Sequence, residues 1–265
     1  MTRTATTSTP LDVMEELMNA TWPALDVLEQ DGWVLRSSEA VTKRANSVWP
    51  RVTQGVRIQS NVRQAEHWYA ERQQPAVFQL SDRPENSELD IFLAGQGYSR
   101  QAETLIMTAG TTRAAPRGSQ NTLNPGAGQT TLEVSSTPTA QWLELWCTIE
   151  GTATPSERKV ARALVQSVPS LYVSAVDGNG AVVGTGRVSV NNGWGGIYCM
   201  GVHPDHRRQG IASTIVEYLT ACANEHGATH GWLLVAAANL AAQKLYASNG
   251  FTEVGRYHYR RQPEA

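Results

Sequence analysis

The sequence lacks the features that would place it in several large classes of protein. No stretch approaches the roughly 18 consecutive apolar residues of a membrane-spanning helix, and the N-terminal MTRTATTSTP has no apolar core of a signal peptide. The 22 lysines and arginines are balanced by 24 aspartates and glutamates, for a net charge of -2, so the basic excess of a dedicated nucleic-acid-binding protein is missing. We therefore expect neither a membrane nor a nucleic acid as partner.

Cysteine is scarce as well. The three cysteines, Cys147, Cys199 and Cys222, are odd in number and widely spaced, so they predict neither a disulfide framework nor a CxxC metal site. We expect a reducing, cytoplasmic setting and no bound metal. Cys199 lies on a predicted buried strand, where a cysteine is usually a packing residue.

The remaining composition is that of an ordinary globular protein, with 41% hydrophobic and 17% charged residues. One stretch departs from it, because residues 109–129 are dominated by Gly, Pro, Ser, Thr, Asn and Gln and have almost no apolar periodicity. This composition is typical of a linker. It divides the 265 residues into a flexible tail at 1–9, an N-terminal domain at 10–108 and a C-terminal domain at 130–265.

The two domains have sequences that fit one common plan. In both, a predicted hairpin ends in Val-x-Pro, and a later short helix closes with Gly followed by an aromatic residue. The hairpin strands are expected at 32–36 and 44–50, and at 180–190 and 195–204. Pro50 precedes Gly97 by 47 residues, and Pro204 precedes Gly250 by 46. The matching order and spacing favour a duplicated fold.

Strand and helix signals alternate through the C-terminal domain. Asp-Gly-Asn-Gly at 177–180 is a strong hairpin turn, Gly151 ends one helix and Asn239 caps another. Strands are expected at 131–136, 180–190, 195–202, 231–238 and, as an edge strand, 252–260; helices are expected at 139–151, 155–168, 213–225 and 239–250. The pattern predicts an α/β fold in which helices flank a mixed, mostly antiparallel, twisted sheet, in two copies in tandem.

One turn of the C-terminal domain has the composition of an anion site. The stretch VHPDHRRQGIA (202–212) joins a strand to a helix, whose first backbone N–H groups are free at the positive end of the helix dipole. Gly210 allows close approach of an anion, and a guanidinium from Arg207 or Arg208 can bind phosphate through two hydrogen bonds. The alternative is an ordinary solvated turn. Its place between a strand and an amphipathic helix favours a diphosphate site.

Two stretches, VHPDHRRQGIA and NLAAQKLYASNGF (239–251), resemble motifs of the GNAT superfamily of acetyl-CoA-dependent N-acyltransferases. The first is similar to the family's pyrophosphate-binding motif Q/R-x-x-G-x-G/A, and the second to its later Asn…Leu-Tyr…Gly-Phe motif. Residues 131–260 follow the family's order of elements. The resemblance implies acetyl-CoA as co-substrate, an amine as acceptor and direct transfer without an acyl-enzyme.

The resemblance also assigns roles to residues of this chain. It implies that backbone groups of Met200 and Val202 hold the pantetheine arm and polarise the acetyl carbonyl. Asn239 is expected to contact the pantetheine or the attacking side, and Tyr246 to protonate the departing thiolate. The residues expected to bind the diphosphate of coenzyme A are Arg207, Arg208, Gln209, Gly210, Ile211, Ala212 and Ser213. Spacing alone adds that Asn239 and Tyr246, seven residues apart, share one face of their helix.

The N-terminal copy lacks these groups. The segment after Pro50, RVTQGVRIQS, contains no Arg-x-x-Gly-x-Ala, and Leu93 stands where the C-terminal copy has Tyr246. We therefore predict a degenerate GNAT-like copy at residues 10–108 that shapes the acceptor cleft or stabilises the fold.

The C-terminal copy departs from the family at the general base. Many members carry a glutamate on the strand before Val-x-Pro, whereas residues 197–200 read Ile-Tyr-Cys-Met. One explanation is that Glu144 or Glu150 reaches the site from the first helix pair. The other is that both lie on a solvated helix face and that a weakly basic acceptor, such as an α-amino group, needs little base.

Two classes of function follow. The first is an N-acetyltransferase for a small amine or amino acid, with Tyr246 as general acid; a protein N-terminus or a lysine as acceptor stays open. The second is a non-catalytic acyl-CoA-binding regulatory protein. Asn239 and Tyr246 argue against the second, because a pure binder needs no proton donor there. The sequence also leaves oligomer formation open.

Overall fold

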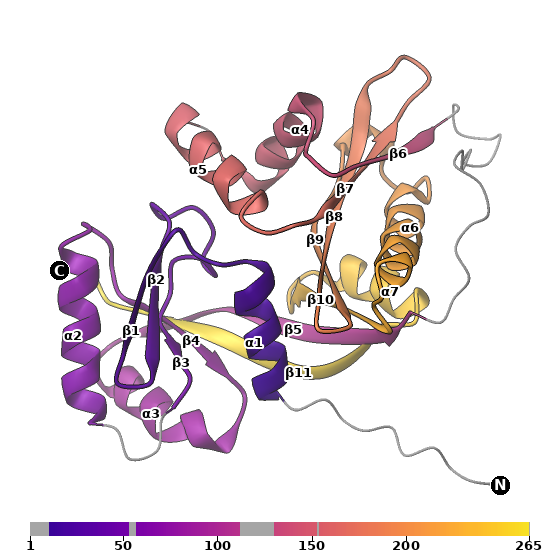
Figure 1. The fold of residues 1–265 in the computed structure, drawn as a ribbon. Helices are drawn as coiled ribbons and strands as arrows, with labels where there is room; N and C mark the ends of the chain where they lie inside the picture. Colours follow the sequence, from indigo (N-terminus) through magenta and orange to yellow (C-terminus); the bar gives the residue numbers. More distant parts are fainter. Residues whose placement is uncertain (1–10, 53–56, 112–129, 153, 265) are drawn as a thin grey trace, which may run out of the picture.

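The computed structural model describes residues 11–52, 57–111, 130–152 and 154–264, so the expected tail and most of the expected linker lie outside the described residues. The elements of the N-terminal part are α1 Leu11–Thr21, β1 Asp26–Gln30, β2 Trp33–Ser37, β3 Trp49–Pro50, α2 Ile58–Ala70, β4 Val77–Ser81, the short helix η1 Pro84–Asn86, α3 Ser87–Gly95 and β5 Ser99–Gly110. Those of the C-terminal part are β6 Thr131–Ser135, α4 Ala140–Glu150, α5 Pro155–Val165, β7 Leu171–Val176, β8 Val182–Asn191, β9 Trp194–Val202, η2 Pro204–His206, α6 Ile211–Glu225, β10 His230–Ala236, α7 Leu240–Ser248 and β11 Thr252–Arg261 (Figure 1).

Eight strands form one sheet that runs through both parts of the chain. Its order is β4-β11-β5-β10-β9-β8-β7-β6; β9 and β10 are parallel, and the other neighbouring pairs are antiparallel. A smaller antiparallel sheet consists of β1, β2 and β3. Around the C-terminal strands, α4 and α5 lie on one side and α6 and α7 on the other (Figure 1). The predicted mixed, mostly antiparallel sheet flanked by helices is confirmed.

The last strand of each part pairs with strands of the other part. β11 lies between β4 and β5, with Gln79 of β4 opposite Tyr259 and Ser99 of β5 opposite Arg261. β5 in turn pairs with β10 of the C-terminal part. The prediction of an edge strand at 252–260 is therefore wrong. Side-chain alternation determines which face of a strand is buried, but it does not determine the strand's neighbours.

The order of elements repeats along the chain. The series β2-β3-α2-β4-α3-β5 is followed by β8-β9-α6-β10-α7-β11. This repetition supports a tandem arrangement. The limits proposed for the two domains, 10–108 and 130–265, stay a prediction, since the large sheet joins both parts.

Local signals set the ends of several helices. Gly151 ends α4 in the left-handed conformation, with φ 75°. Thr154 and Glu157 form a capping box at the start of α5. The side chain of Asn239 accepts a hydrogen bond of 3.1 Å from the backbone N–H of Ala242, as predicted for the cap of α7.

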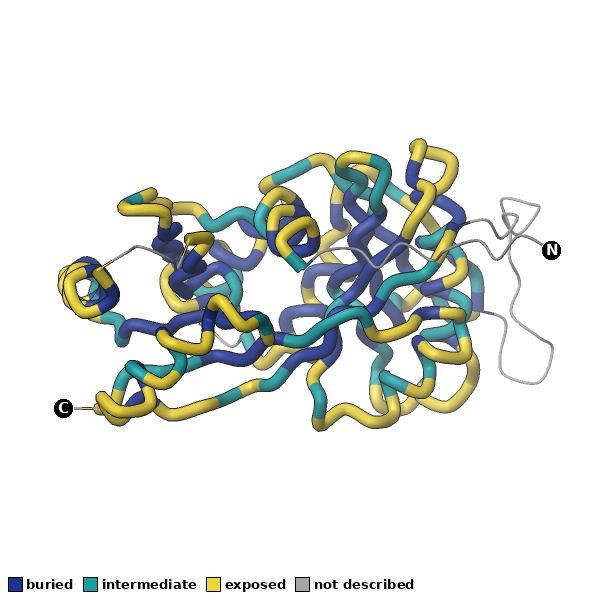
Figure 2. Tube along the Cα trace, turned by 90° about the horizontal axis from the view of Figure 1, so that it is seen from below, coloured by how far each residue is buried: buried dark blue, intermediate teal, exposed yellow. Residues whose placement is uncertain are grey.

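Two apolar clusters cover the two faces of the C-terminal half of the sheet. We call them the α4 face, where α1, α4 and α5 pack, and the α6 face, where α6 and α7 pack. The predicted apolar stripe of α6 is buried on the α6 face. The missing side chain of Gly186 lets α6 pack close to β8. A Cβ at Gly186 would be only 2.6 Å from Cγ2 of Ile215 and 2.7 Å from Cδ1 of Leu219. Buried residues concentrate along the strands, and exposed ones along turns and outer helix faces (Figure 2).

Candidate active site

The sheet opens between its two parallel strands. β9 pairs with β10 from Trp194 to Ile197, opposite His230 to Leu233, whereas β9 continues to Val202 and β10 to Ala236. Beyond Ile197 no backbone pairing joins the described residues of the two strands. Backbone groups of β9 after Ile197 are therefore not used by β10.

A bulge in β9 lies at the start of this opening. Thr185 of β8 is opposite Gly201 and Arg187 is opposite Tyr198, so Cys199 and Met200 together face the single residue between them on β8. Cys199 has a φ of 54°, which is unusual for a residue with a side chain. The Thr185 hydroxyl donates a 2.9 Å hydrogen bond to the Cys199 carbonyl and holds the bulge. Met200 and Val202, the predicted pantetheine residues, lie beyond it on the strand.

The arginine-rich turn follows β9 and leads into α6. Gly210 is the N-cap of α6 with φ 82°, and Arg208 before it has φ 62°. Arg207, Arg208 and Gln209 are exposed, and the first turn of α6 contains no acidic residue. A Cβ at Gly210 would meet no atom within 4 Å, so the left-handed backbone, rather than crowding, favours glycine there. The described turn thus presents free helix N–H groups and two exposed guanidinium groups, with Asp205 in η2 as its one acidic residue.

The first turn of α6 also contacts α7. Ile211 is buried and Ala212 is half-buried. Ser213 accepts a 3.0 Å hydrogen bond at Oγ from Nδ2 of Asn249, at the end of α7. The predicted diphosphate residues thus lie together at the N-terminus of α6, with the Ile211 side chain in the core and Ser213 bonded to the end of α7.

Tyr246 lies two turns after Asn239 and is 7% exposed. Its ring packs edge-to-face on Phe251, with 6.3 Å between ring centroids. Tyr246, Met200 and Val202 all belong to the apolar cluster of the α6 face. Burial raises the pKa of Tyr246 to about 12, so the phenol is protonated at neutral pH.

A cavity of about 330 Å³ lies on the opposite face of the opening. We call it the junction cavity because both parts of the chain line it. The lining residues are Trp22, Thr42, Lys43, Arg44, Ala102, Thr104, Trp146, Glu150, Tyr198, Cys199, Leu234, Ala236, Tyr257 and Tyr259. Its volume is at the lower end of the range for small-molecule sites.

One of the two candidate carboxylates reaches this cavity. Glu150, the last residue of α4, is exposed on its outer side and lines the junction cavity with Cys199. Burial raises the pKa of Glu150, while the charge of Arg44 opposes the shift. Glu144 forms an ion pair with Arg158 and faces a different cavity. Of these two carboxylates, Glu150 is the one that lines the junction cavity.

Cys199 is the other reactive side chain in the junction cavity. Burial raises the pKa of its thiol well above the usual range, which keeps the thiol protonated. A protonated thiol is a poor nucleophile, so the environment of Cys199 does not favour an acyl-enzyme.

Several cavity residues were not among the sequence-based candidates. Arg44 lies in the stretch 44–50, which we predict as a strand. The structure forms a strand there only at Trp49 and Pro50, opposite Val34 and Trp33, and an isolated bridge from Val48 to Phe78. Trp22 directly follows α1, and Tyr257 and Tyr259 belong to β11, at the opposite end of the described chain. No local pattern could find them, because long-range strand pairing brings them together. In the N-terminal copy, Leu93 is fully buried in a separate apolar cluster.

Within the described residues, no group of three or more His, Cys, Asp or Glu side chains is arranged to hold a metal ion. No helix in this part of the chain is long and apolar enough to cross a membrane. A larger cavity of about 560 Å³ in the N-terminal part, lined among others by Glu15 and Trp33, contains none of the predicted site residues.

The strand opening, the helix-terminal anion site and the cavity on the opposite face define a GNAT-type acyltransferase. A family model described as "Probable histone acetyltransferase Rv0428c C-terminal" matches residues 10–260. "Uncharacterized N-acetyltransferase YobR" of Bacillus subtilis (strain 168) is 30% identical over 250 residues, which cover 93% of this chain and 96% of that protein. The chain therefore belongs to the GNAT-type N-acetyltransferases, in the family that this model describes.

Shorter and more distant similarities agree. The "[Ribosomal protein bS18]-alanine N-acetyltransferase" of Escherichia coli (strain K12) is 39% identical over 57 residues, 22% of this chain and 38% of that protein. The fold matches a GCN5-related N-acetyltransferase from Kribbella flavida, with a TM-score of 0.69, 17% identity and coverage of 99% and 98% of the two chains. It also matches a tandem GNAT protein from the clavulanic acid biosynthesis pathway, with a TM-score of 0.57, 13% identity and coverage of 83% and 76%.

Proposed function

We propose that the protein transfers an acetyl group from acetyl-CoA directly to a primary amine, with a small amine or an amino acid as acceptor. The observation that carries this proposal is the opening between β9 and β10. We propose that this opening connects the helix N-terminus on the α6 face with the cavity on the α4 face, which is lined by a carboxylate. Donor and acceptor can then enter from opposite faces and meet between the strands.

Acetyl-CoA binding is assigned to the α6 face. The surface from Arg207 to Ser213 fits a diphosphate, because it offers free helix N–H groups and two exposed guanidinium groups and no acid in the first turn of α6. Backbone groups of Met200 and Val202 are proposed to hold the pantetheine arm and polarise the acetyl carbonyl. Asn239, at the start of α7, is proposed to contact the same arm.

The acceptor amine is assigned to the junction cavity. Its nitrogen attacks the thioester carbonyl carbon, the carbon–sulfur bond breaks, and one amine proton must leave. Glu150 is the proposed proton acceptor, because it lines this cavity and its raised pKa makes it a better base than a carboxylate with an ordinary pKa. An α-amino acceptor, which is partly neutral at physiological pH, would need less help from this base.

Tyr246 is proposed as the general acid toward the departing sulfur. Its phenol is protonated at neutral pH and lies in the cluster that contains Met200 and Val202. A phenol with a pKa of about 12 is a weaker acid than a free one. We therefore propose that its hydroxyl stabilises the thiolate first by a hydrogen bond and then by proton transfer.

Two alternatives remain candidates. The family description names a histone acetyltransferase, and one relative is named for an alanine of a ribosomal protein, so a protein acceptor is the first. A non-catalytic acyl-CoA-binding regulator is the second. The cytoplasmic setting expected from three free cysteines and the oligomeric state stay predictions.

Release of free thiol from acetyl-CoA across a panel of amines tests the proposal. We expect turnover with at least one small amine or amino acid, and loss of coenzyme A binding in Arg208→Glu and Gly210→Trp. Tight coenzyme A binding without turnover on any amine would support the regulator instead. Intact binding in both variants would refute the assignment of the α6 terminus.

A further inference from the structure

The junction cavity has an excess of positive charge. Lys43 and Arg44 line it, against the single carboxylate of Glu150. Arg187 adds a third cation just behind the cavity wall, since its guanidinium lies 5.4 Å from the ring centre of Tyr198. A cavity with this balance attracts an anionic group and repels a basic peptide.

Arg44 is held among aromatic rings rather than by a carboxylate. Its guanidinium carbon lies 5.7 Å from the ring centre of Trp22 and 5.3 Å from that of Tyr198, and Tyr257 and Tyr259 are close to the same group. Its Nε is buried without a hydrogen-bond partner. Within the described residues Arg44 forms no ion pair, although it is close enough to Glu150 to affect that carboxylate's pKa. A guanidinium so placed has unused donors for a planar anion.

Arg187 does not supply this function. It is fully buried, and both of its terminal nitrogens donate to the carbonyl of Thr21 at 3.3 Å. The guanidinium groups of Arg44 and Arg187 both lie within 5.7 Å of the ring centres of Trp22 and Tyr198. Arg44 is therefore the arginine that lines the cavity and is available to a ligand.

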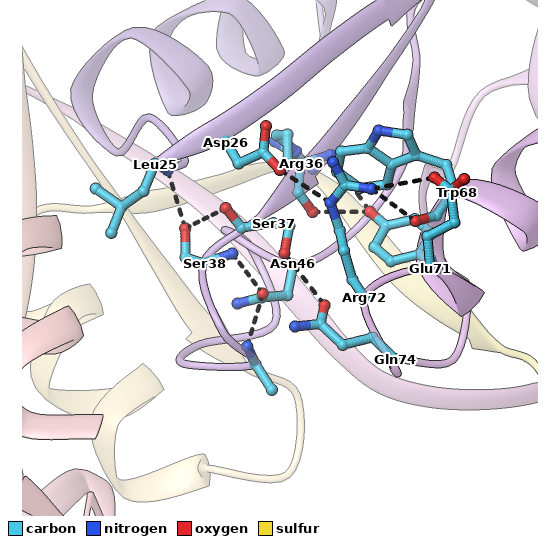
Figure 3. A network of polar contacts seen from close by, with 12 residues as sticks. Leu25, Asp26, Arg36, Ser37, Ser38, Asn46, Trp68, Glu71, Arg72 and Gln74 are labelled. Atoms are coloured by element: carbon cyan, nitrogen blue, oxygen red, sulfur yellow. Dashed lines mark hydrogen bonds and ion pairs between the residues drawn. The ribbon is translucent and has the colours of Figure 1, made fainter. Parts of the chain in front are cut away.

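The loop that carries Arg44 is held in shape by one side chain. Asn46 accepts hydrogen bonds at Oδ1 from the N–H groups of Ser38 and Ala40 and donates from Nδ2 to the carbonyls of Val41 and Thr42, all between 2.7 and 2.9 Å. Figure 3 shows Asn46 bonded to Ser38, beside the network of Asp26 and Arg72. The loop is thus ordered before any ligand arrives, which lowers the cost of binding.

We propose that the junction cavity selects an acceptor that carries a carboxylate, which pairs with Arg44 while the amine lies toward Glu150 and Cys199. The acceptor class is then a free amino acid or a molecule of similar size and charge, rather than the lysine side chain of a basic protein. The cavity volume of about 330 Å³ accommodates such a molecule. This inference rests on the proposed function, because it names the acceptor of the same transfer.

Paired acceptors test the proposal directly. Glycine and L-alanine are compared with glycinamide and L-alaninamide, and with a lysine-containing basic peptide, at equal concentrations of neutral amine. We expect kcat/KM to be at least about tenfold higher for the carboxylates, as for one hydrogen-bonded charge pair in a partly desolvated site. Equal or higher kcat/KM for the amides or the basic peptide would overturn the proposal.

Arg44→Gln tests whether this residue carries the preference. We expect kcat/KM to fall about 10- to 100-fold for the carboxylates and less than about threefold for the amides, with partial recovery in Arg44→Lys. Arg162→Gln, which removes an exposed arginine of α5, is the matched control. It should change kcat/KM neither for the carboxylates nor for the amides. A preference that survives in Arg44→Gln would refute the role of Arg44.

A binding measurement separates this inference from the transfer reaction. N-acetylglycine and N-acetylglycinamide are titrated into the full-length protein while the intrinsic tryptophan fluorescence, to which Trp22 and Trp146 of the cavity contribute, is followed. If N-acetylglycine binds more tightly than N-acetylglycinamide, and Arg44→Gln removes this difference, the cavity assignment is supported even if no amine is acetylated. In that case the proposed function alone fails. Turnover without carboxylate preference would refute the acceptor class and leave the transferase intact.

Discussion

Tyr246→Phe separates a catalytic from a structural role for the tyrosine. Tyr246 is 7% exposed, and its ring packs on Phe251. Its hydroxyl has no hydrogen-bond partner among the described residues. Removing the hydroxyl therefore breaks no hydrogen bond of the fold and leaves the ring packing in place. We expect the free energy of unfolding to change by less than about 1 kcal/mol.

The expected effect on the reaction is much larger. General acid catalysis contributes typically about 100- to 10,000-fold, so kcat should fall by that factor, which raises the barrier by about 3 to 5 kcal/mol. Because Tyr246 acts on the departing sulfur in this mechanism, the affinity for coenzyme A should change little. The stability of the variant and its activity should thus move independently.

Thiol release at saturating acetyl-CoA, coenzyme A binding and thermal unfolding are measured on the same preparations. Tyr218→Phe is the matched control, since Tyr218 lies on α6 at the border of the same cluster and has no proposed role. Wild-type kcat in Tyr246→Phe would refute the general-acid assignment. A large loss of melting temperature with a proportional loss of activity would show that the hydroxyl serves the fold.

Three further predictions concern the base, the helix packing and the cap. Burial raises the pKa of Glu150, and only its deprotonated form accepts a proton. In the pH profile, kcat/KM should therefore fall with decreasing pH at a value above the ordinary glutamate pKa of about 4.3. Glu150→Gln should abolish this fall of kcat/KM at acidic pH. If the pH at which kcat/KM falls in the wild type shifts with the pKa of each acceptor amine, the reaction needs little base from the protein. Gly186→Ala forces a Cβ against Ile215 and Leu219 and should cost about 1 to 3 kcal/mol in chemical denaturation; wild-type stability would refute the close packing of α6 on β8. Asn239→Ala should lose about 1 kcal/mol from the α7 cap and raise the KM for acetyl-CoA, whereas loss of stability alone would leave the residue a cap only.

The sequence predicts well whatever depends on neighbouring residues. The stop at Gly151, the cap at Asn239 and the buried stripe of α6 are all seen in the structure. Each rests on backbone conformations or helical spacing within a few residues. The family motifs at 202–212 and 239–251 are likewise continuous stretches, and the family they indicate is confirmed.

What the sequence could not predict depends on contacts between distant residues. The position of β11 between β4 and β5 follows from which strand edges are free after folding, and no repeat within β11 encodes it. The junction cavity brings together Arg44, Glu150 and Tyr257, which are each more than 100 residues apart in the sequence. Glu150 could be named as a candidate base but not distinguished from Glu144, because both lie on the same helix.

The exchange of β5 and β11 ties the order of folding to the whole chain. β4 and β5 cannot be joined into one sheet until β11 is available, and β11 is the last described strand to be synthesised. Pairings across such sequence distances form slowly, and until β11 pairs, the edges of β4 and β5 that it covers stay open. At high concentration those open edges would accept β11 from a second molecule, so we expect refolding at high concentration to yield domain-swapped dimers.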